Sequence, residues 1–88
     1  MYLGMDFGTS GARACVLDDT GAIAHQDRIA YADAERQTPE DWRAALHTLL
    51  RNLPATVSTQ LQRIALDATS ASVLLCDADL QAVSPALL

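Results

Sequence analysis

Lysine is absent from this chain of 88 residues, and all six of its basic residues are arginine. The arginines are scattered along the sequence, and the net charge at neutral pH is −5. Proteins that bind nucleic acids or anionic membranes through charge carry a basic patch or stripe. The composition therefore argues against both kinds of partner. The missing lysine also excludes a Walker A loop, because that loop uses a lysine to reach the nucleotide phosphates.

Long apolar runs and closely spaced cysteines are also lacking. No run approaches the roughly 20 apolar residues that span a bilayer, and no basic segment followed by an apolar one marks a signal peptide at the N-terminus. We therefore expect a cytoplasmic protein. Cys15 and Cys76 lie far apart in apolar runs, which predicts two buried free thiols rather than a metal site. Aromatic residues are only 5 % of the chain, so small aliphatic side chains must form most of the core.

The first third of the chain predicts an antiparallel meander of three strands. Residues 2–7 alternate in polarity and read as a short strand. Residues 12–18 are apolar on both faces, as in a central strand, whereas residues 22–31 are more polar, as at the edge of a sheet. Residues 8–11 and 18–21 form the two connecting turns, because both stretches contain glycine next to small polar residues.

A helix with strong start signals follows the meander. Thr38 is the expected N-cap, Pro39 occupies the first helical position, and Asp41 takes the place of the capping-box acid. Pro54 is expected to end the helix, and residues 55–62 to form a short second one. The apolar stripe of the helix consists of Trp42, Ala45, Leu46, Leu49, Leu50 and Leu53. Trp42 is therefore interpreted as a core residue rather than as a sugar-stacking aromatic.

The last third of the chain predicts more strands. Residues 63–67 read as a buried strand that follows a crossover helix, and residues 73–77 as another strand. Residues 77–79 look like a turn, with residues 81–83 returning as a hairpin partner. The order β-β-β-α-β indicates an α/β fold with a mixed sheet. Because one long helix covers only one face of a sheet and the last residues are apolar, we expect the chain to be part of a longer protein. The isolated 88 residues would then expose apolar surface, through which we expect them to be able to self-associate as a dimer.

The stretch MDFGTSGARA, residues 5–14, contains the main chemical signal. Gly8 and Gly11 are expected to adopt positive φ in the turn, so that successive N–H groups converge on an anion beside the hydroxyls of Thr9 and Ser10. Asp6 would repel a bare phosphate, but a Mg²⁺ ion between the two groups makes the interaction attractive. This pattern favours Mg-nucleotide, although the same residues also suit a hairpin turn that binds nothing.

The segment GMDFGTSGARACVLDDTG resembles the first phosphate motif of the FGGY carbohydrate kinases, which belong to the superfamily of actin, hexokinase and the heat-shock ATPases. ERQTPEDW and RIALDATSASVLLCDADLQAVSPAL resemble two later segments of the same family. The resemblance covers nearly all of residues 1–88, as a partial N-terminal domain with a ribonuclease-H-like fold. It implies that Asp6 holds Mg²⁺, that Gly8, Thr9 and Ser10 face the phosphates of ATP, and that Arg13 lies near the transferred phosphoryl group.

The resemblance also implies a sugar-binding segment. Asp67, Thr69 and Ser70 follow a predicted strand, and ligands of open α/β sheets favour the carboxyl ends of strands. In the family this segment helps to line the sugar pocket. The run LDATS looks closest to kinases of five-carbon ketoses, ribulose kinases above all. Xylulose kinases commonly carry a Met-His pair where this chain has Ser70 and Ala71.

These residues predict the N-terminal part of a kinase that transfers the γ-phosphoryl group of Mg-ATP to a sugar hydroxyl, with a ketopentose such as ribulose or xylulose as substrate. The resemblance places the catalytic base and the adenine pocket beyond residue 88, so we expect the chain alone to be inactive. Two alternatives stay open at this point. One is a stand-alone binding or scaffold module, and the other is a different actin-like ATPase with the same phosphate turn.

Overall fold

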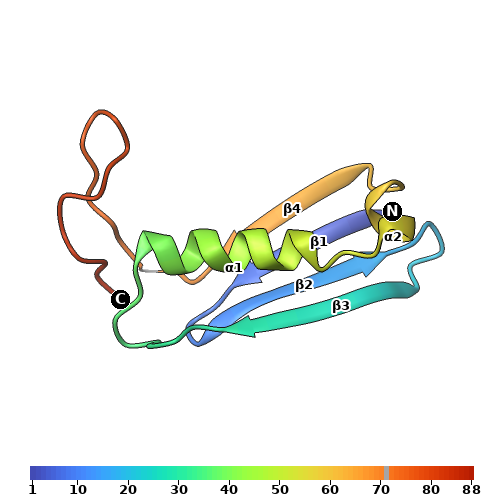
Figure 1. The fold of residues 1–88 in the computed structure, drawn as a ribbon, viewed down its shortest axis with the longest axis horizontal. Helices are drawn as coiled ribbons and strands as arrows, with labels where there is room; N and C mark the ends of the chain where they lie inside the picture. The colour runs from blue at the N-terminus through green and yellow to red at the C-terminus, as the bar shows by residue number, and fades with distance from the viewer. Residues whose placement is uncertain (71) are drawn as a thin grey trace.

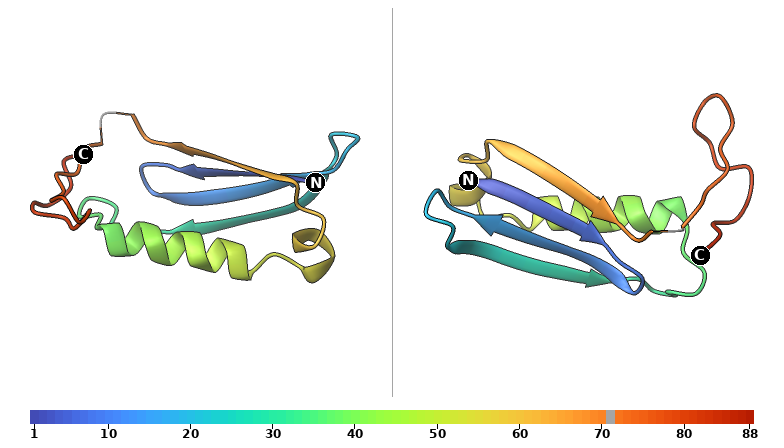
Figure 2. Two further views of the ribbon diagram at one scale, coloured as in Figure 1. Left: turned by 90° about the horizontal axis from the view of Figure 1, so that it is seen from above. Right: turned by 180° about the vertical axis from the view of Figure 1, so that it is seen from behind.

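The computed structural model describes residues 1–70 and 72–88. A four-stranded mixed sheet has the spatial order β3-β2-β1-β4, and one long helix lies along one face of it (Figures 1 and 2). The elements follow each other as predicted, β-β-β-α-β, with a short helix α2 before the last strand. Their bounds are β1 Tyr2–Phe7, β2 Gly11–Leu17, β3 Ile23–Ala30, α1 Pro39–Arg51, α2 Ala55–Ser58 and β4 Arg63–Ala68.

The predicted meander is confirmed, because β2 pairs antiparallel with both β1 and β3. The turn between β2 and β3 uses Gly21 at φ 83°, a conformation that glycine adopts without steric cost. Asp18 stabilises this turn, since its carboxylate accepts hydrogen bonds from the hydroxyl of Thr20 and from the N–H groups of Thr20 and Ala22. The same bonds, that from the Thr20 hydroxyl first, lower the pKa of Asp18.

Helix α1 begins at the predicted capping box. The Thr38 side chain accepts a hydrogen bond from the Asp41 N–H, and the Asp41 carboxylate accepts one from the Thr38 N–H. The helix packs on β2 and β3 through its apolar stripe, in which Ala45 and Leu49 are buried. The core consists of these two residues with Leu3, Met5, Ala12, Ala14, Val16, Tyr31 and Val57.

Strand β4 joins the sheet through the predicted crossover and pairs parallel with β1. The expectation that this strand is buried was wrong, because all six of its residues are exposed. Helix α1 covers β2 and β3 rather than β4, and no other strand among the described residues pairs with the outer edge of β4. Ile64 and Leu66 are consequently 55 % and 63 % exposed.

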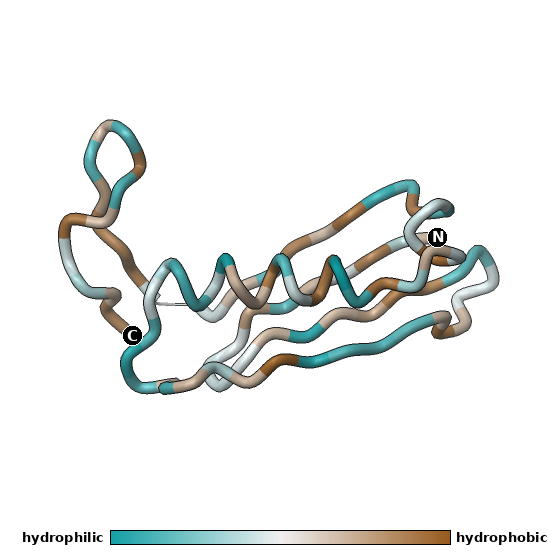
Figure 3. Tube along the Cα trace, viewed as in Figure 1, coloured by the Kyte–Doolittle hydropathy of each residue, from teal (hydrophilic) through white to brown (hydrophobic). Residues whose placement is uncertain are grey.

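The segment after β4 extends away from the sheet, and apolar positions occur along it (Figures 1 and 3). The strand predicted at residues 73–77 does not form. Only isolated bridges occur, between Val73 and Leu87 and between Cys76 and Ala82, because no neighbouring strand extends the pairing. The turn at 77–79 is confirmed, with the Asp77 carboxylate accepting from the N–H groups of Asp79 and Gln81.

The expectation about the two cysteines was wrong. The cysteines are not buried thiols, since Cys15 is half-buried on the sheet face that α1 leaves open and Cys76 is exposed in the C-terminal segment. The described residues contain no helix of the length and hydropathy needed to cross a lipid bilayer.

Candidate functional site

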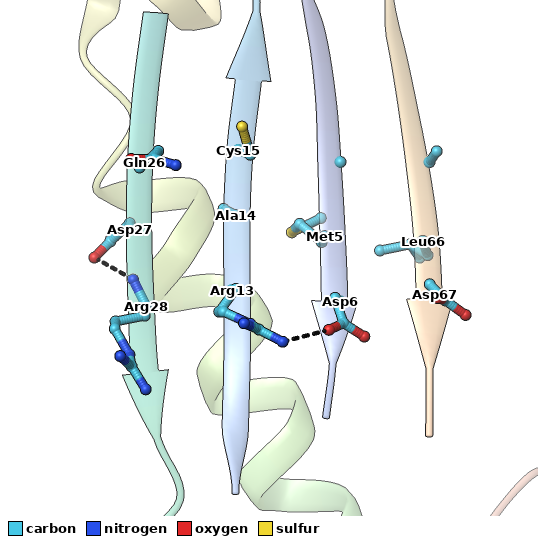
Figure 4. A pocket seen from close by; sticks show the side chains of 12 residues that line it. Met5, Asp6, Arg13, Ala14, Cys15, Gln26, Asp27, Arg28, Leu66 and Asp67 are labelled. Atoms are coloured by element: carbon cyan, nitrogen blue, oxygen red, sulfur yellow. Dashed lines mark hydrogen bonds and ion pairs between the residues drawn. The ribbon is translucent and has the colours of Figure 1, made fainter. Parts of the chain in front are cut away.

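The predicted site residues gather at one end of the sheet, where β1 and β4 both end. The two strands are parallel neighbours, and Asp6 pairs in register with Asp67. Residues in register share a face of the sheet, so the two carboxylates lie on the same side, opposite α1. Figure 4 shows them side by side, with the Arg13 side chain extending from β2 toward Asp6. Asp6 and Asp67 are thus neighbours in the structure although they lie far apart in the sequence.

Asp6 and Arg13 form an ion pair across the β1–β2 ladder. The distance from the Arg13 Nη2 to the Asp6 Oδ2 is 3.1 Å, and the side chains are 68 % and 43 % exposed, respectively. Exposed pairs of this kind contribute only about 0–1 kcal/mol to stability. The pair therefore orients both side chains but is weak enough for either one to contact a ligand instead. Arg13 also keeps further N–H donors for a second anion.

The turn from Gly8 to Gly11 closes with a hydrogen bond from the Gly8 N–H to the Gly11 carbonyl, at 2.8 Å. The expectation of positive φ at these glycines was wrong, because among the described residues Gly21 is the only glycine with that conformation. Gly11 is required for another reason. A Cβ atom at this position would lie 2.2 Å from the carbonyl oxygen of Ile29, so the close approach of β3 needs glycine.

Thr9 and Ser10 form the exposed tip of this turn. Among the described residues, neither their N–H groups nor their hydroxyls donate a hydrogen bond to the protein. Their carbonyls, by contrast, are both used. The Ser10 carbonyl accepts from the Tyr31 N–H at 3.0 Å, and the Thr9 carbonyl accepts from the Gln37 side chain at 2.7 Å. The turn is thus held through its carbonyls, while the donors of the exposed Thr9 and Ser10 stay available to a ligand.

Gln37 is a residue of the site that the sequence analysis missed. It is 8 % exposed, and its amide donates to the carbonyls of Thr9 and Ala34 while accepting from the Trp42 indole N–H. Both ends of the buried amide are therefore satisfied. A polar residue directly before an N-cap is ordinary, so its sequence position gives no signal. Trp42 packs against the core, as predicted, and also orients Gln37.

The segment after β4 is held to the end of β1 by one residue. Both the N–H and the hydroxyl of Thr69 donate to the Phe7 carbonyl, at 2.9 and 3.1 Å. The Thr69 oxygen can therefore act toward a ligand only as an acceptor. Asp67 accepts from the N–H of Ala68, and Ser70 is exposed. Ala71, which stands at the second position of the Met-His pair of xylulose kinases, lies outside the described residues.

Two hollows adjoin this end of the sheet. The larger one, about 780 Å³, lies on the open face over Asp6, Arg13 and Asp67. The smaller one, about 420 Å³, lies on the side of α1, between Trp42 and Thr69. The two hollows lie on opposite faces of the sheet, and Gly8 of the turn lines the smaller one.

The donor set suits a metal ion that arrives with its ligand. Within residues 1–70 and 72–88, no three His, Cys, Asp or Glu side chains come close enough to form a complete metal cage. Mg²⁺ does not need one, because it keeps several waters and binds one or two carboxylates together with phosphate oxygens. Asp6, with Asp67 beside it in register, supplies such carboxylates, and the unused N–H groups of Thr9 and Ser10 supply donors for phosphate.

Comparison with known proteins gives related sequences and folds. No family model matches the chain. The xylulose kinase of Klebsiella pneumoniae is 30 % identical over 95 residues, which cover all of this chain and 20 % of that enzyme. The structure of a xylulose kinase from Brucella ovis superposes with a TM-score of 0.84 at 25 % identity, over 99 % of this chain and 20 % of the other.

A gluconate kinase from Lactobacillus acidophilus shares the fold, with a TM-score of 0.76 at 14 % identity over 98 % of this chain and 19 % of the other. The chain thus spans about a fifth of the length of the kinases it matches. Its mixed sheet is that of the N-terminal part of sugar kinases with the actin-like ATPase fold. In sequence and in fold, the chain corresponds to the N-terminal fifth of an FGGY-type sugar kinase.

Proposed function

We propose that this chain provides the phosphate-binding part of a carbohydrate kinase that transfers the γ-phosphoryl group of Mg-ATP to a sugar hydroxyl. The observation that carries the proposal is the arrangement at the end of β1. An exposed carboxylate, its exposed arginine partner and a turn in which the donors of Thr9 and Ser10 are unused lie next to one another. Phosphoryl transfer depends mainly on positioning and charge stabilisation, and this arrangement offers both.

The roles follow from the chemistry of each group. Mg²⁺, when bound with ATP, neutralises phosphate charge and orients the γ-phosphoryl group. Asp6 holds the hydrated ion, and the N–H groups and hydroxyls of Thr9 and Ser10 bind phosphate oxygens. Gly8 faces the phosphates as the start of the turn, with its own N–H bonded to the Gly11 carbonyl. Arg13 leaves Asp6 to contact the transferred group, a change that costs little because the ion pair is exposed. Gln37 keeps the turn in its receptive shape through the Thr9 carbonyl.

The sugar is proposed to bind on the β4 side of the turn. Asp67 and Ser70 present exposed oxygens there, and Thr69 holds their segment against β1. A ketopentose is the proposed substrate, and the likeness to the xylulose kinases of Klebsiella pneumoniae and Brucella ovis favours xylulose over ribulose. The catalytic base and the adenine pocket belong to a further part of such a kinase, so the 88 residues alone are expected to bind weakly without turnover. The proposal includes a cytoplasmic location, where ATP is plentiful.

Backbone NMR of the 88-residue chain tests the phosphate site directly. Mg²⁺ with a non-hydrolysable ATP analogue should shift the amide signals of Gly8, Thr9 and Ser10, and Mg²⁺ should strengthen this response. In Asp6→Asn the gain from Mg²⁺ should disappear. Asp18→Asn is the matched control, since Asp18 also lies at a turn of the same hairpin sheet but at its opposite end. Shifts elsewhere, or an unchanged Mg²⁺ effect in Asp6→Asn, would contradict the proposal.

A chimera tests the transfer reaction. Residues 1–88 replace the matched fifth of the Klebsiella pneumoniae xylulose kinase, and phosphorylation of xylulose and ribulose is measured. We expect an active kinase. In Asp6→Asn its rate of sugar phosphorylation should fall by about a hundredfold or more, as it does when a group that stabilises transition-state charge is removed. A folded chimera that hydrolyses ATP without phosphorylating either sugar would instead favour an ATPase of the same superfamily.

A further inference from the structure

Arg13 lies between two charged residues of opposite sign. Asp6 of β1 is its register partner on one side, and Arg28 of β3 is its register partner on the other. Residues in register share a face of the sheet, so all three side chains lie on the face opposite α1. Figure 4 shows them in one row, with Arg13 extending toward Asp6 and Arg28 extending toward the C-terminal end of its own strand. Both registers are set by the three strands of the meander, whatever covers the sheet elsewhere.

Arg13 and Arg28 form the closer of the two kinds of cross-strand pair. At the start of the β2–β3 ladder the Tyr31 N–H donates to the Ser10 carbonyl, as in a hydrogen-bonded pair. The two kinds of pair alternate along an antiparallel ladder, so Arg13 and Arg28, three positions further on, are a non-hydrogen-bonded pair. The Cα atoms of such a pair lie about 4.5 Å apart.

Asp6 and Arg13 form the wider kind of pair. They lie two positions from Gly8 and Gly11, whose N–H and carbonyl are hydrogen-bonded at 2.8 Å, so their Cα atoms are about 5.5 Å apart. The backbone of Arg13 is thus nearer to Arg28 than to Asp6. Like charges directly opposite each other destabilise a sheet, so the fold itself gains nothing from this pair of arginines.

The charge of Arg28 restricts where the Arg13 side chain can lie. Two guanidinium groups repel each other, so Arg28 disfavours conformations in which Arg13 leans over β3. The observed conformation leans the other way, with the Arg13 Nη2 at 3.1 Å from the Asp6 Oδ2. The restriction matters most when Asp6 binds Mg²⁺, because the ion pair then no longer holds Arg13.

We propose that Arg28 is a positioning residue of the phosphate site, which keeps Arg13 on the β1 side of the sheet when Asp6 binds Mg²⁺. Arg13 is then directed at the phosphoryl group beside the turn instead of relaxing over β3. This role rests on the proposed function, since it requires an anion at the turn. It accounts for a like-charge pair that the fold does not need.

Kinetics of the chimera with the xylulose kinase test the role. Arg28→Glu should lower kcat by about tenfold, because the new carboxylate would pair with Arg13 and hold it over β3. Arg28→Gln should lower kcat by about threefold, since exposed charges interact weakly, and Arg28→Lys should restore most of the rate. Arg63→Glu is the matched control, because it makes the same charge change at an exposed residue at the other end of the sheet.

A double-variant comparison separates positioning from a direct effect on phosphate. In an Arg13→Gln background the Arg28 substitutions should have no further effect on kcat, because Arg28 acts through Arg13. Circular dichroism verifies that each variant is folded. An Arg28→Glu loss that persists undiminished in this background, or a normal kcat for Arg28→Glu alone, would overturn the proposal.

NMR of the 88-residue chain tests the same coupling without nucleotide or sugar. The ¹³C signal of the Asp6 carboxylate reports the ion pair, and its position in Arg13→Gln marks the broken pair. Arg28→Glu should move this signal toward that position, whereas Arg28→Lys and Arg63→Glu should leave it in place. An unmoved signal in Arg28→Glu would overturn the proposal. If the signal moves as expected but the wild-type chimera phosphorylates no sugar, the proposed function fails while the control of Arg13 by Arg28 stands.

Discussion

The first 62 residues and the remainder of the chain contrast sharply in packing. Every buried residue lies at or before Val57, and none of the described residues from Arg63 onward is buried. Apolar side chains are common in both regions, so composition does not explain the difference (Figure 3). What differs is coverage, because α1 lies over β2 and β3 and leaves β4 bare. Burial in this chain is thus decided by the position of one helix.

The same contrast divides the candidate site. The phosphate turn belongs to the packed region, where Tyr31 and Gln37 fix its carbonyls. The proposed sugar segment belongs to the bare region, where Thr69 alone among the described residues ties it to β1. A phosphate site must be preorganised to stabilise charge. We infer that the turn is ready to bind in this chain, whereas the sugar segment needs further packing to form a pocket.

The largest expected effect comes from truncating leucine in each region. Leu49→Ala removes a side chain with 0 % exposure and should lower the free energy of unfolding by about 2–5 kcal/mol. Leu66→Ala removes a side chain that is 63 % exposed and should cost less than about 1 kcal/mol. Urea denaturation followed by circular dichroism measures both. Similar losses in the two variants would mean that β4 is buried in solution.

A second pair compares two glycines within the packed region. Gly11→Ala would bring a Cβ to 2.2 Å from the Ile29 carbonyl oxygen, so β3 must move, at a cost of about 2–3 kcal/mol. Gly4→Ala is the control, because its Cβ would meet its nearest atom at 4.0 Å. Amide hydrogen exchange in β3 should accelerate in Gly11→Ala only. Unchanged protection from exchange in β3 would show that β3 can move away from position 11 without losing its hydrogen bonds to β2.

Much of this architecture follows from local signals in the sequence. The pattern of apolar residues and the glycine-containing turns predicted the meander, and Thr38, Pro39 and Asp41 predicted the start of α1, because capping and pleating involve residues close in sequence. Whether β4 is buried depends on which strands the helix covers, and that depends on residues far apart in the sequence. An apolar strand such as RIALDA looks buried to any local criterion, so its exposure could not be predicted.

The site was predictable to a similar degree. Asp6, Arg13 and the turn could be found because they are neighbours in the sequence. The register that joins Asp6 to Asp67 required the crossover, and the role of Gln37 required the fold that brings it to Thr9. The glycines of the turn were recognised as necessary, but for a conformational reason where the structure shows a steric one at Gly11.

Gln37 provides the next prediction, since it supports the turn from the packed side. Gln37→Leu leaves the Thr9 carbonyl and the Trp42 indole N–H without their partner, which should cost about 1–3 kcal/mol. The NMR response of Thr9 and Ser10 to Mg²⁺ and nucleotide should weaken as well. Gln26→Leu, an exposed change on β3, should alter neither property. A stable Gln37→Leu chain with a normal response would show that the turn holds its shape unaided.

The smallest expected effect lies where α1 ends beside β3. The Asn52 side chain donates to Asp27 at 2.9 Å, and this bond, followed by that from the Arg28 N–H, lowers the pKa of Asp27. The folded chain binds the proton of the Asp27 carboxyl more weakly than the unfolded chain does. The contribution of the Asn52–Asp27 bond to stability is therefore complete above pH 4 to 5, near the unfolded pKa of about 4. It is lost as the pH falls through the folded value.

Asn52→Ala should therefore lower the free energy of unfolding by less than about 0.5 kcal/mol near neutral pH, since the bond is exposed. The difference from wild type should vanish once Asp27 is protonated, and Asp27→Ala should remove the effect of Asn52→Ala at every pH. Urea denaturation from pH 7 to pH 3 measures this. A difference that persists at low pH would mean that Asn52 stabilises the chain through its position as the C-cap of α1, independently of its bond to Asp27.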